Sequence, residues 1–143
     1  MSQQLVTLLL GSNLDLPERK IETAINRIEN EIGSIVQRTE ILHTKPVEFV
    51  SNNIFCNIAL RIITHFSPVK LLDLIKKIEF EMGRPEDSLI TKEYADRVID
   101  IDVVFYGNIK FSSGRLNIPH QKHLYEREFS KKLLLGIEKT LKT

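Results

Sequence analysis

The sequence is poor in several residue types that support particular structures. Its 143 residues include one cysteine, Cys56, and no tryptophan. A single cysteine excludes an internal disulfide and a cysteine-based metal site, and it is typical of a reducing compartment. No hydrophobic run approaches the ~20 residues of a membrane-spanning helix. The first residues, Met1 to Gln4, lack the basic region of a signal peptide. We therefore expect a cytoplasmic protein.

Neither acidic nor basic residues predominate, since the formal net charge is only +1. Nucleic acids and anionic membranes attract strongly basic proteins, so neither is an expected partner. The motifs GxxxxGK[ST] and GxGxxG are absent, which excludes a P-loop and a Rossmann fingerprint. The content of hydrophobic residues, 42%, is ordinary for a globular chain and supports a real core. This length favours one domain, residues 1–143, and we expect a monomer that acts on small molecules.

The most informative stretch runs from Arg97 to Gly107, where residue character alternates with period two. This pattern predicts a half-buried strand. The face predicted to meet the core consists of Ile99, Ile101, Val103 and Phe105. The opposite face consists of Val98, Asp100, Asp102, Val104 and Tyr106. The Cα atoms of the two aspartates would then lie roughly 6.6 Å apart. Two carboxylates at this spacing suit Mg²⁺ held together with substrate phosphates. The solvated face of an edge strand is the alternative explanation.

Hydrophobic periodicity predicts the remaining elements. Two amphipathic helical stripes begin at Ile21 and Leu71, and each is followed by a glycine. The predicted order is a strand at 5–10, a helix at 17–32, a poorer strand at 35–43, a loop at 44–53, a strand at 54–62, a helix at 68–82, a polar loop at 84–96, a strand at 97–106, a hairpin strand at 109–111 and a helix at 129–141. We predict an α+β protein with a ferredoxin-like βαββαβ antiparallel sheet, helices packed on one face and a further C-terminal helix.

The strand at 54–62 also has two distinct faces. Its core-facing residues are predicted to be Ile54, Cys56, Ile58, Leu60 and Ile62, with Cys56 acting as a small hydrophobic residue. Phe55 and Asn57 lie on the other face, near the loop at 44–47. A planar heterocycle would stack on an aromatic ring and pair with an amide, and this region offers both. The ordinary exposed side of a strand explains each residue taken individually.

Two further groups suit phosphate binding. Gly11-Ser12-Asn13 follows the first strand, and backbone N–H groups in such a turn can hold phosphate oxygens. An ordinary strand-to-helix turn explains these three residues as well. Basic side chains that could surround phosphates, and that would otherwise be solvated, are Lys77, Arg84, Lys92, Arg97, Arg115, His120, His123 and Arg127. Glu79, near the end of the second helix, is interpreted as a structural residue.

These motifs occur in an order typical of one enzyme family. They are Gly11-Ser12-Asn13, Phe55-x-Asn57, Glu79 with Gly83-Arg84, Arg97-x-x-Asp100-Ile101-Asp102, Arg115-Leu116-x-Ile118-Pro119-His120 and Glu126-Arg127-x-Phe129. From about Leu8 to Phe129, the chain resembles the 6-hydroxymethyl-7,8-dihydropterin pyrophosphokinases of the folate pathway. The strand with Arg97 and the two aspartates, followed by Pro119-His120, is the most specific part of this resemblance.

The resemblance implies a ferredoxin-like fold and the transfer of the β,γ-diphosphate of ATP to the pterin hydroxymethyl group, with release of AMP. It implies two Mg²⁺ ions bound by Asp100 and Asp102, which would also stand near the attacking hydroxyl, with Arg84 and Arg97 assisting catalysis. The implied pterin site consists of Thr44, Pro46, Val47, Phe55, Asn57 and Phe129. The implied ATP site consists of Glu79, Arg84, Arg97, Arg115, His120 and Arg127.

The chain departs from the family pattern at several positions. Glu86 occupies the place of a second loop arginine, and Gln121 stands where some members have an aromatic residue. The loop after Arg84 is longer than usual and contains Tyr94, and the C-terminal tail is short. We expect these differences to affect loop closure and ATP affinity more than the fold or metal binding.

Two other functions are alternatives to this one. Nucleotidyltransferases of the polymerase-beta type also combine a Gly-Ser turn with paired aspartates, but there the pair follows the turn closely. Here Asp100 lies far along the chain from Ser12, which argues against that class. A non-enzymatic ferredoxin-like module that binds a ligand is the second alternative. Such a module would need no metal ion, so substitution of Asp100 would leave its ligand binding unchanged.

Overall fold

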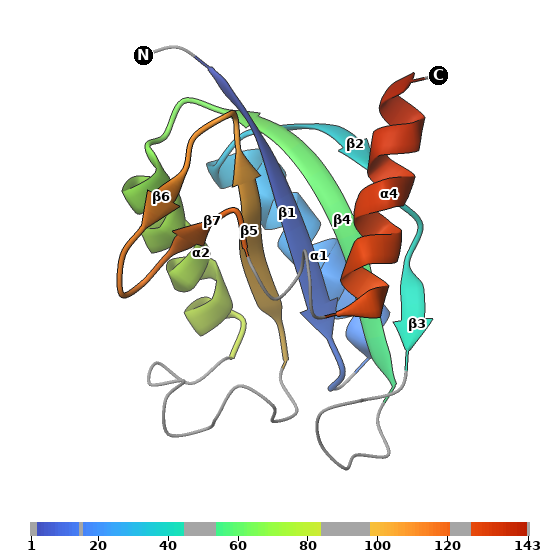
Figure 1. The fold of residues 1–143 in the computed structure, drawn as a ribbon. Helices are drawn as coiled ribbons and strands as arrows, with labels where there is room; N and C mark the ends of the chain where they lie inside the picture. Colours follow the sequence, from blue (N-terminus) through green and yellow to red (C-terminus); the bar gives the residue numbers. More distant parts are fainter. Residues whose placement is uncertain (1–2, 15, 45–53, 84–97, 121–126, 143) are drawn as a thin grey trace.

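A computed structural model describes residues 3–14, 16–44, 54–83, 98–120 and 127–142 (Figure 1). Its elements are β1 (Gln4–Ser12), α1 (Pro17–Glu31), β2 (Ser34–Arg38), β3 (Leu42–Thr44), β4 (Phe55–Thr64), α2 (Pro68–Glu81), β5 (Asp100–Tyr106), β6 (Phe111–Ser112), β7 (Asn117–Ile118) and α4 (Glu128–Lys142). The predicted α+β class is confirmed. None of the helices in these ranges combines the length and apolar character that a membrane span requires.

The main sheet has the strand order β2-β4-β1-β5, with β3 pairing beside β2 on β4. Every pairing in it is antiparallel, as predicted. β1 lies in the middle, and its residues from Val6 to Ser12 are all buried. Both of its faces are therefore covered, which explains why this segment reads as a continuous apolar run instead of an alternating one.

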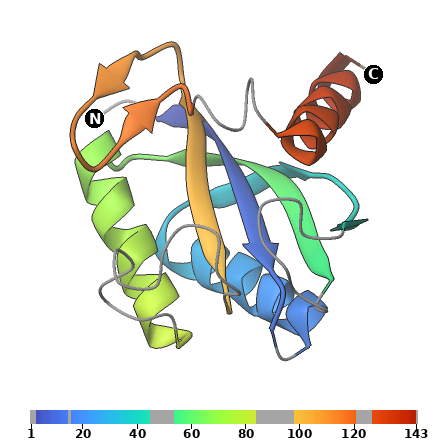
Figure 2. The ribbon, with the colours of Figure 1, turned by 60° about the horizontal axis from the view of Figure 1, so that its bottom comes forward.

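Helices α1 and α2 cover one face of this sheet (Figures 1 and 2). Each begins with a proline in its first turn, and the Ser67 hydroxyl accepts a hydrogen bond from the Lys70 N–H, at 3.3 Å, to cap α2. Gly83, at φ 109°, follows the end of α2 in the left-handed conformation that favours glycine. The buried stripes of the two helices are Ile21, Ala24, Ile25 and Ile28, and Leu71, Leu72, Ile75, Ile78 and Glu79. Together with the sheet they form the larger hydrophobic core.

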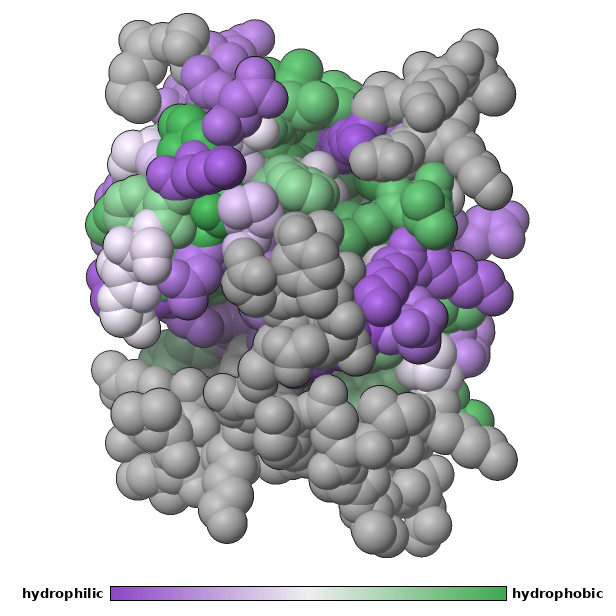
Figure 3. All heavy atoms as spheres, viewed as in Figure 1, coloured by the Kyte–Doolittle hydropathy of each residue, from purple (hydrophilic) through white to green (hydrophobic). Residues whose placement is uncertain are grey.

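Helix α4 packs on the opposite face, so that the sheet lies between two layers of helix (Figure 2). The smaller core on this side consists of Leu9, Ala59, Val104, Leu133, Leu134 and Ile137. Figure 3 views this side of the molecule, where hydrophilic and hydrophobic surfaces are interspersed. The C-terminal helix was predicted, but not the face that it covers. It packs on Leu9, which pairs with Asp102, so α4 lies on the same face of the sheet as Asp102.

The predicted strand at 35–43 is two strands, and Thr44 belongs to the second of them instead of a loop. The segment between β2 and β3 is still hydrogen-bonded to β4, through Thr39. The Thr39 hydroxyl accepts a hydrogen bond from the Ala59 N–H at 3.1 Å, and the Thr39 N–H donates to the Ala59 carbonyl at 3.0 Å. Ile54 was predicted to face the core but is 52% exposed, because β4 begins one residue later.

A β-bulge in β5 overturns part of the predicted alternation. The pairing shifts between Thr7 and Leu8 of β1, so Tyr106 pairs with Val6 and reaches the larger core. Its hydroxyl donates a hydrogen bond to the Phe66 carbonyl, and burial raises the pKa of this phenol. Phe105 was predicted to face that core but packs under α4 instead. One extra residue in a strand reverses the side to which all later side chains point.

The prediction that residues 109–111 pair back on the preceding strand as a hairpin is also wrong. After the turn at Gly107-Asn108, the chain does not pair back on β5 in this segment. Instead β6 pairs with β7 as a separate two-stranded sheet. Leu116 and Ile118 of this unit join the larger core, and Arg115 pairs with Asp73 of α2 at 2.8 Å. The apolar side chains of this hairpin thus extend the core past the end of the main sheet.

Candidate active site

Three neighbouring strands bring Asn57, Gly11 and Asp100 into one row of the sheet. Gly11 of β1 pairs with Asn57 of β4 on one side and with Asp100 of β5 on the other. Residues paired in one row project from the same face, and adjacent strands lie ~4.8 Å apart. The backbones of Asn57 and Asp100 are therefore about 10 Å apart, and Gly11, the residue between them in the row, has no side chain. This arrangement places an amide and a carboxylate on either side of a glycine, on one face of the sheet.

Glycine suits position 11 because a side chain here would collide with Asn57, and not because the chain turns. A Cβ atom at this position would lie 2.8 Å from the Asn57 Oδ1 atom, closer than Cβ contacts allow. The Asn57 amide therefore leans over the Gly11 backbone. The predicted turn at Gly11-Ser12 is wrong, because β1 continues through both residues. The fully buried Ser12 instead donates its hydroxyl hydrogen bond to the Val98 carbonyl, which ties the end of β1 to the start of β5.

The two aspartates of β5 lie on the same face, as the alternation before the bulge predicts. Both are half-buried, and the buried Ile101 lies between them on the opposite face. Asp102 pairs with Leu9, which belongs to the smaller core under α4. The carboxylates thus stand where the apolar surface beneath α4 ends. Oxygen donors at i and i+2 on one strand are a suitable ligand set for a divalent cation such as Mg²⁺.

Glu79 supports this strand from α2. It is 2% exposed, and its Oε2 atom accepts a hydrogen bond from the Ile101 N–H at 2.7 Å. Its Oε1 atom forms an ion pair with the Lys76 Nζ atom at 3.2 Å. A buried carboxylate needs such partners to offset its lost hydration. Glu79 therefore holds the backbone between the two aspartates in place, in line with its predicted structural role.

The side chains on the other side of the row are those predicted to hold a heterocycle. The Asn57 amide Nδ2 atom donates a hydrogen bond to the Thr44 hydroxyl at 3.4 Å, and Thr44 pairs in the sheet with the half-buried Phe55. Phe129, at the start of α4, packs against the smaller core. The structure therefore brings Thr44, Phe55 and Asn57 together at the end of the sheet that holds Asp100.

The remaining predicted residues are placed as follows. Arg115 is exposed and paired with Asp73. His120 is half-buried, and its backbone N–H donates to the Val104 carbonyl at 3.1 Å, so it lies beside β5. Arg127 is half-buried just before α4. The predicted residues Pro46, Val47, Arg84 and Arg97 lie outside the described residues, as does Tyr94.

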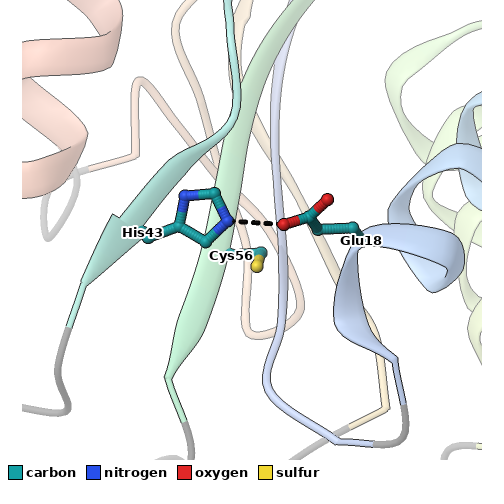
Figure 4. A group of neighbouring side chains, drawn as sticks. All are labelled: Glu18, His43 and Cys56. Atoms are coloured by element: carbon teal, nitrogen blue, oxygen red, sulfur yellow. Dashed lines mark hydrogen bonds and ion pairs between the residues drawn. The ribbon is translucent and has the colours of Figure 1, made fainter.

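One cluster was not predicted from the sequence. Glu18 of α1, His43 of β3 and Cys56 of β4 lie together on the face opposite the aspartates (Figure 4). The His43 Nε2 atom is 2.7 Å from the Glu18 Oε1 atom. Cys56 is buried, and burial, followed by the charge of Glu18, raises the pKa of its thiol. The three residues are far apart in the sequence, and only the pairing of β3 with β4 brings His43 beside Cys56.

Comparisons with known proteins agree with the resemblance seen in the sequence. Residues 7–139 match the family model of 7,8-dihydro-6-hydroxymethylpterin-pyrophosphokinase (HPPK). A folate synthesis bifunctional protein of Arabidopsis thaliana is 36% identical over 124 residues, which are 87% of this chain and 25% of that protein. The 2-amino-4-hydroxy-6-hydroxymethyldihydropteridine pyrophosphokinase of Haemophilus influenzae is 32% identical over 121 residues, which are 84% of this chain and 72% of that protein.

The chain thus spans about a quarter of the plant protein but most of the bacterial one. Among solved structures, Plasmodium falciparum HPPK-DHPS, wild type with pterin and p-hydroxybenzoate, superimposes with a TM-score of 0.66 at 17% identity. The match covers 94% of this chain and 38% of that one. At this identity the likeness concerns the fold.

Proposed function

Because this chain belongs to the 7,8-dihydro-6-hydroxymethylpterin-pyrophosphokinase family, we propose that it transfers diphosphate from ATP to 6-hydroxymethyl-7,8-dihydropterin. The hydroxymethyl oxygen attacks the β-phosphorus of ATP, the bond from this phosphorus to the α-phosphate oxygen breaks, and AMP leaves. The products are AMP and the pterin diphosphate. The observation that carries the proposal is the row of Asn57, Gly11 and Asp100 across three strands.

This row supports a reaction between two bound substrates. A pterin ring held by Asn57 would place its hydroxymethyl group toward β5, along the row that ends in Asp100. The aspartates would stand at the β5 end of this row, where phosphates must be neutralised. Holding two reactants in line at a fixed separation supplies much of the acceleration in such transfers.

The chemistry of the aspartate pair fits Mg²⁺, with two ions proposed from the family resemblance. Asp100 and Asp102 offer hard oxygen donors on one face, half-buried at the edge of an apolar surface. Mg²⁺ would neutralise the charge on the transferred phosphates and on the departing AMP. Asp100, at the β5 end of this row, would also accept a hydrogen bond from the attacking hydroxyl and so orient it. Glu79 keeps the strand that carries both aspartates in place.

The pterin site is proposed to consist of Thr44, Pro46, Val47, Phe55, Asn57 and Phe129. The Asn57 amide can pair with the edge of the ring, and aromatic side chains on either side would stack on its faces. The Thr44 hydroxyl, which accepts a hydrogen bond from Asn57, fixes which way this amide points. A fixed amide distinguishes donors from acceptors on the pterin edge, which gives selectivity for this heterocycle.

The ATP site is proposed to consist of Arg84, Arg97, Arg115, His120 and Arg127, with Glu79, which is 2% exposed, acting only through the β5 backbone that it holds. His120 lies beside β5 and Arg127 precedes α4, so both are attached to elements that flank the aspartates. Guanidinium groups bind phosphate oxygens through two parallel hydrogen bonds, which suits a triphosphate. Among these residues, Arg84 and Arg97 are proposed to assist the transfer itself.

Three coarser properties are proposed with this function. The strand order β2-β4-β1-β5, with β2 and β3 sharing one position, supports a ferredoxin-like arrangement. Both cores are built on the same sheet, which supports a single domain over residues 1–143. We also propose a cytoplasmic monomer; the single cysteine supports the reducing compartment.

Product analysis tests the proposal against a non-enzymatic ligand-binding module. The full chain is incubated with ATP, Mg²⁺ and the hydroxymethyl dihydropterin, and nucleotides are separated by chromatography. AMP formed in equal amount to pterin diphosphate supports the enzyme. Binding of pterin without turnover, unaffected by Asp100→Asn, would support the module.

A further inference from the structure

The cluster of Glu18, His43 and Cys56 joins three elements on the α1 side of the sheet (Figure 4). One ligand atom from each residue, a carboxylate oxygen, an imidazole nitrogen and the thiol sulfur, lies within 4.8 Å of the other two. Glu18 is in the first turn of α1, His43 is on β3, and Cys56 is on β4. This set of donors is distinct from the aspartate pair, which lies on the other face of the sheet.

We propose that Glu18, His43 and Cys56 bind one Zn²⁺ ion between α1 and the β3–β4 strand pair. Thiolate, imidazole and carboxylate are the three groups that bind zinc in proteins, whereas Mg²⁺ strongly prefers oxygen ligands. Three protein ligands leave the fourth tetrahedral position to water. The single cysteine makes a multi-cysteine site impossible, but a mixed site needs only one thiolate.

The three ligand atoms, which lie within 4.8 Å of one another, can reach one ion by side-chain movement. Zinc lies ~2.0–2.3 Å from its ligands, so two ligand atoms on one ion are about 3.5 Å apart. The His43 Nε2 and Glu18 Oε1 atoms are now 2.7 Å apart and would open slightly. Both side chains are more than half exposed, at 51% and 61%, and can turn in solvent. Cys56 is held rigidly in β4 and provides the fixed point of the site.

Charge also favours a divalent cation at this place. In the absence of metal, the exposed Glu18 and His43 side chains make a 2.7 Å contact, which contributes little stability at the surface. Metal binding would release the proton of the Cys56 thiol, whose pKa is raised by burial and by Glu18, and the resulting thiolate and the carboxylate together carry two negative charges, which Zn²⁺ neutralises. The ion would tie the first turn of α1 to β3 and β4, so it should also raise the stability of the folded chain.

Cobalt provides a direct probe, because Co²⁺ occupies zinc sites and gives a near-ultraviolet charge-transfer band when bound to thiolate. We expect metal-free full-length protein to bind one equivalent of Co²⁺ with this band, and Zn²⁺ to abolish it by displacement. Cys56→Ala should remove the band. His43→Gln and Glu18→Gln should weaken binding while the fold, followed by circular dichroism, is retained.

Two control variants make the test specific. His65→Gln alters another exposed histidine, which hydrogen-bonds Gln3 through its Nε2 atom at 3.3 Å, and it should keep the band. Asp100→Asn should also keep it, because the aspartate pair is a separate site. Absence of the band in the unmodified protein would overturn the proposal, as would a band that His43→Gln leaves unchanged or that His65→Gln removes equally.

A second measurement does not depend on the cysteine variant. Zn²⁺ should raise the midpoint of thermal unfolding of the unmodified chain in a concentration-dependent way, whereas any increase caused by Mg²⁺, which would bind at the aspartate pair, should be the same in His43→Gln as in the unmodified chain. The increase caused by Zn²⁺ should be lost in His43→Gln and kept in His65→Gln. An equal increase in both variants, or none in the unmodified protein, would contradict the site.

Discussion

The Glu79 carboxylate accepts a hydrogen bond from the backbone N–H of Ile101, the residue between Asp100 and Asp102, at 2.7 Å. β5 ends the strand order of the main sheet in the described part of the chain, so it has no neighbouring strand on its outer side. A helix side chain thus takes the role of a missing neighbouring strand. The positions of both aspartates depend on a residue that lies on the other face of the sheet.

We therefore expect Glu79→Ala to affect both stability and catalysis. Removing the carboxylate leaves the buried Ile101 N–H without its acceptor, which costs about 1–3 kcal/mol of unfolding free energy. The KM for Mg-ATP should rise, since β5 loses its support. Urea unfolding and steady-state kinetics measure the two effects. Glu79→Gln keeps an oxygen acceptor and should lose less in both, whereas equal loss in the two variants would contradict this role.

Asp100→Asn and Asp102→Asn should each lower kcat at least about a hundredfold, because each removes a charged ligand from the proposed Mg²⁺ site. The fold should persist, because both side chains are only half-buried. Glu22→Gln provides the control, as it neutralises an exposed carboxylate that pairs with Arg38 on the other side of the molecule. Full turnover in either aspartate variant would remove the metal-binding role.

Gly11→Ala should weaken pterin binding as much as Asn57→Ala does. The added methyl group would meet the Asn57 Oδ1 atom at 2.8 Å and displace the amide. ATP binding should change much less, which calorimetric titration with each substrate would measure. Gly114→Ala is the matched control, since a Cβ atom there meets nothing within 4 Å. Selective loss of ATP binding in Asn57→Ala would show that the two substrates are assigned to the wrong strands.

Substitutions in α4 test whether this helix is part of the folded unit. Ile137→Ala should lower the free energy of unfolding by about 2–5 kcal/mol, because this side chain is 1% exposed in the smaller core. Leu135→Ala, on the same helix but 57% exposed, should change it by less than about 0.5 kcal/mol. Similar values for the two variants in urea unfolding would mean that α4 does not pack stably on the sheet.

The sequence predicted what local periodicity determines. The stripes of α1 and α2, the burial of Cys56 and the common face of Asp100 and Asp102 followed from regular spacing. The errors occurred where regular spacing ends. The bulge in β5 moved Phe105 to the α4 side, and its signal was absent because Val104, Phe105 and Tyr106 are all apolar enough for either face.

Other features depend on pairings between distant segments. A glycine is needed at position 11 because the Asn57 side chain lies over it, which no pattern within β1 reveals. Likewise, the cluster of Glu18, His43 and Cys56 forms only when β3 pairs with β4 beneath the first turn of α1. The identities of the site residues could be recognised from their order along the chain, but their mutual positions could not.

The most direct test of the central claim follows the phosphates of ATP in a single reaction. The unmodified chain, with Mg²⁺, hydroxymethyl dihydropterin and ATP labelled in its β-phosphate, is sampled over time. The proposed transfer predicts that the label moves entirely to the pterin while unlabelled AMP accumulates in equal amount, and that Asp100→Asn abolishes both. Formation of ADP, release of labelled inorganic diphosphate, or no transfer in the unmodified chain would contradict it.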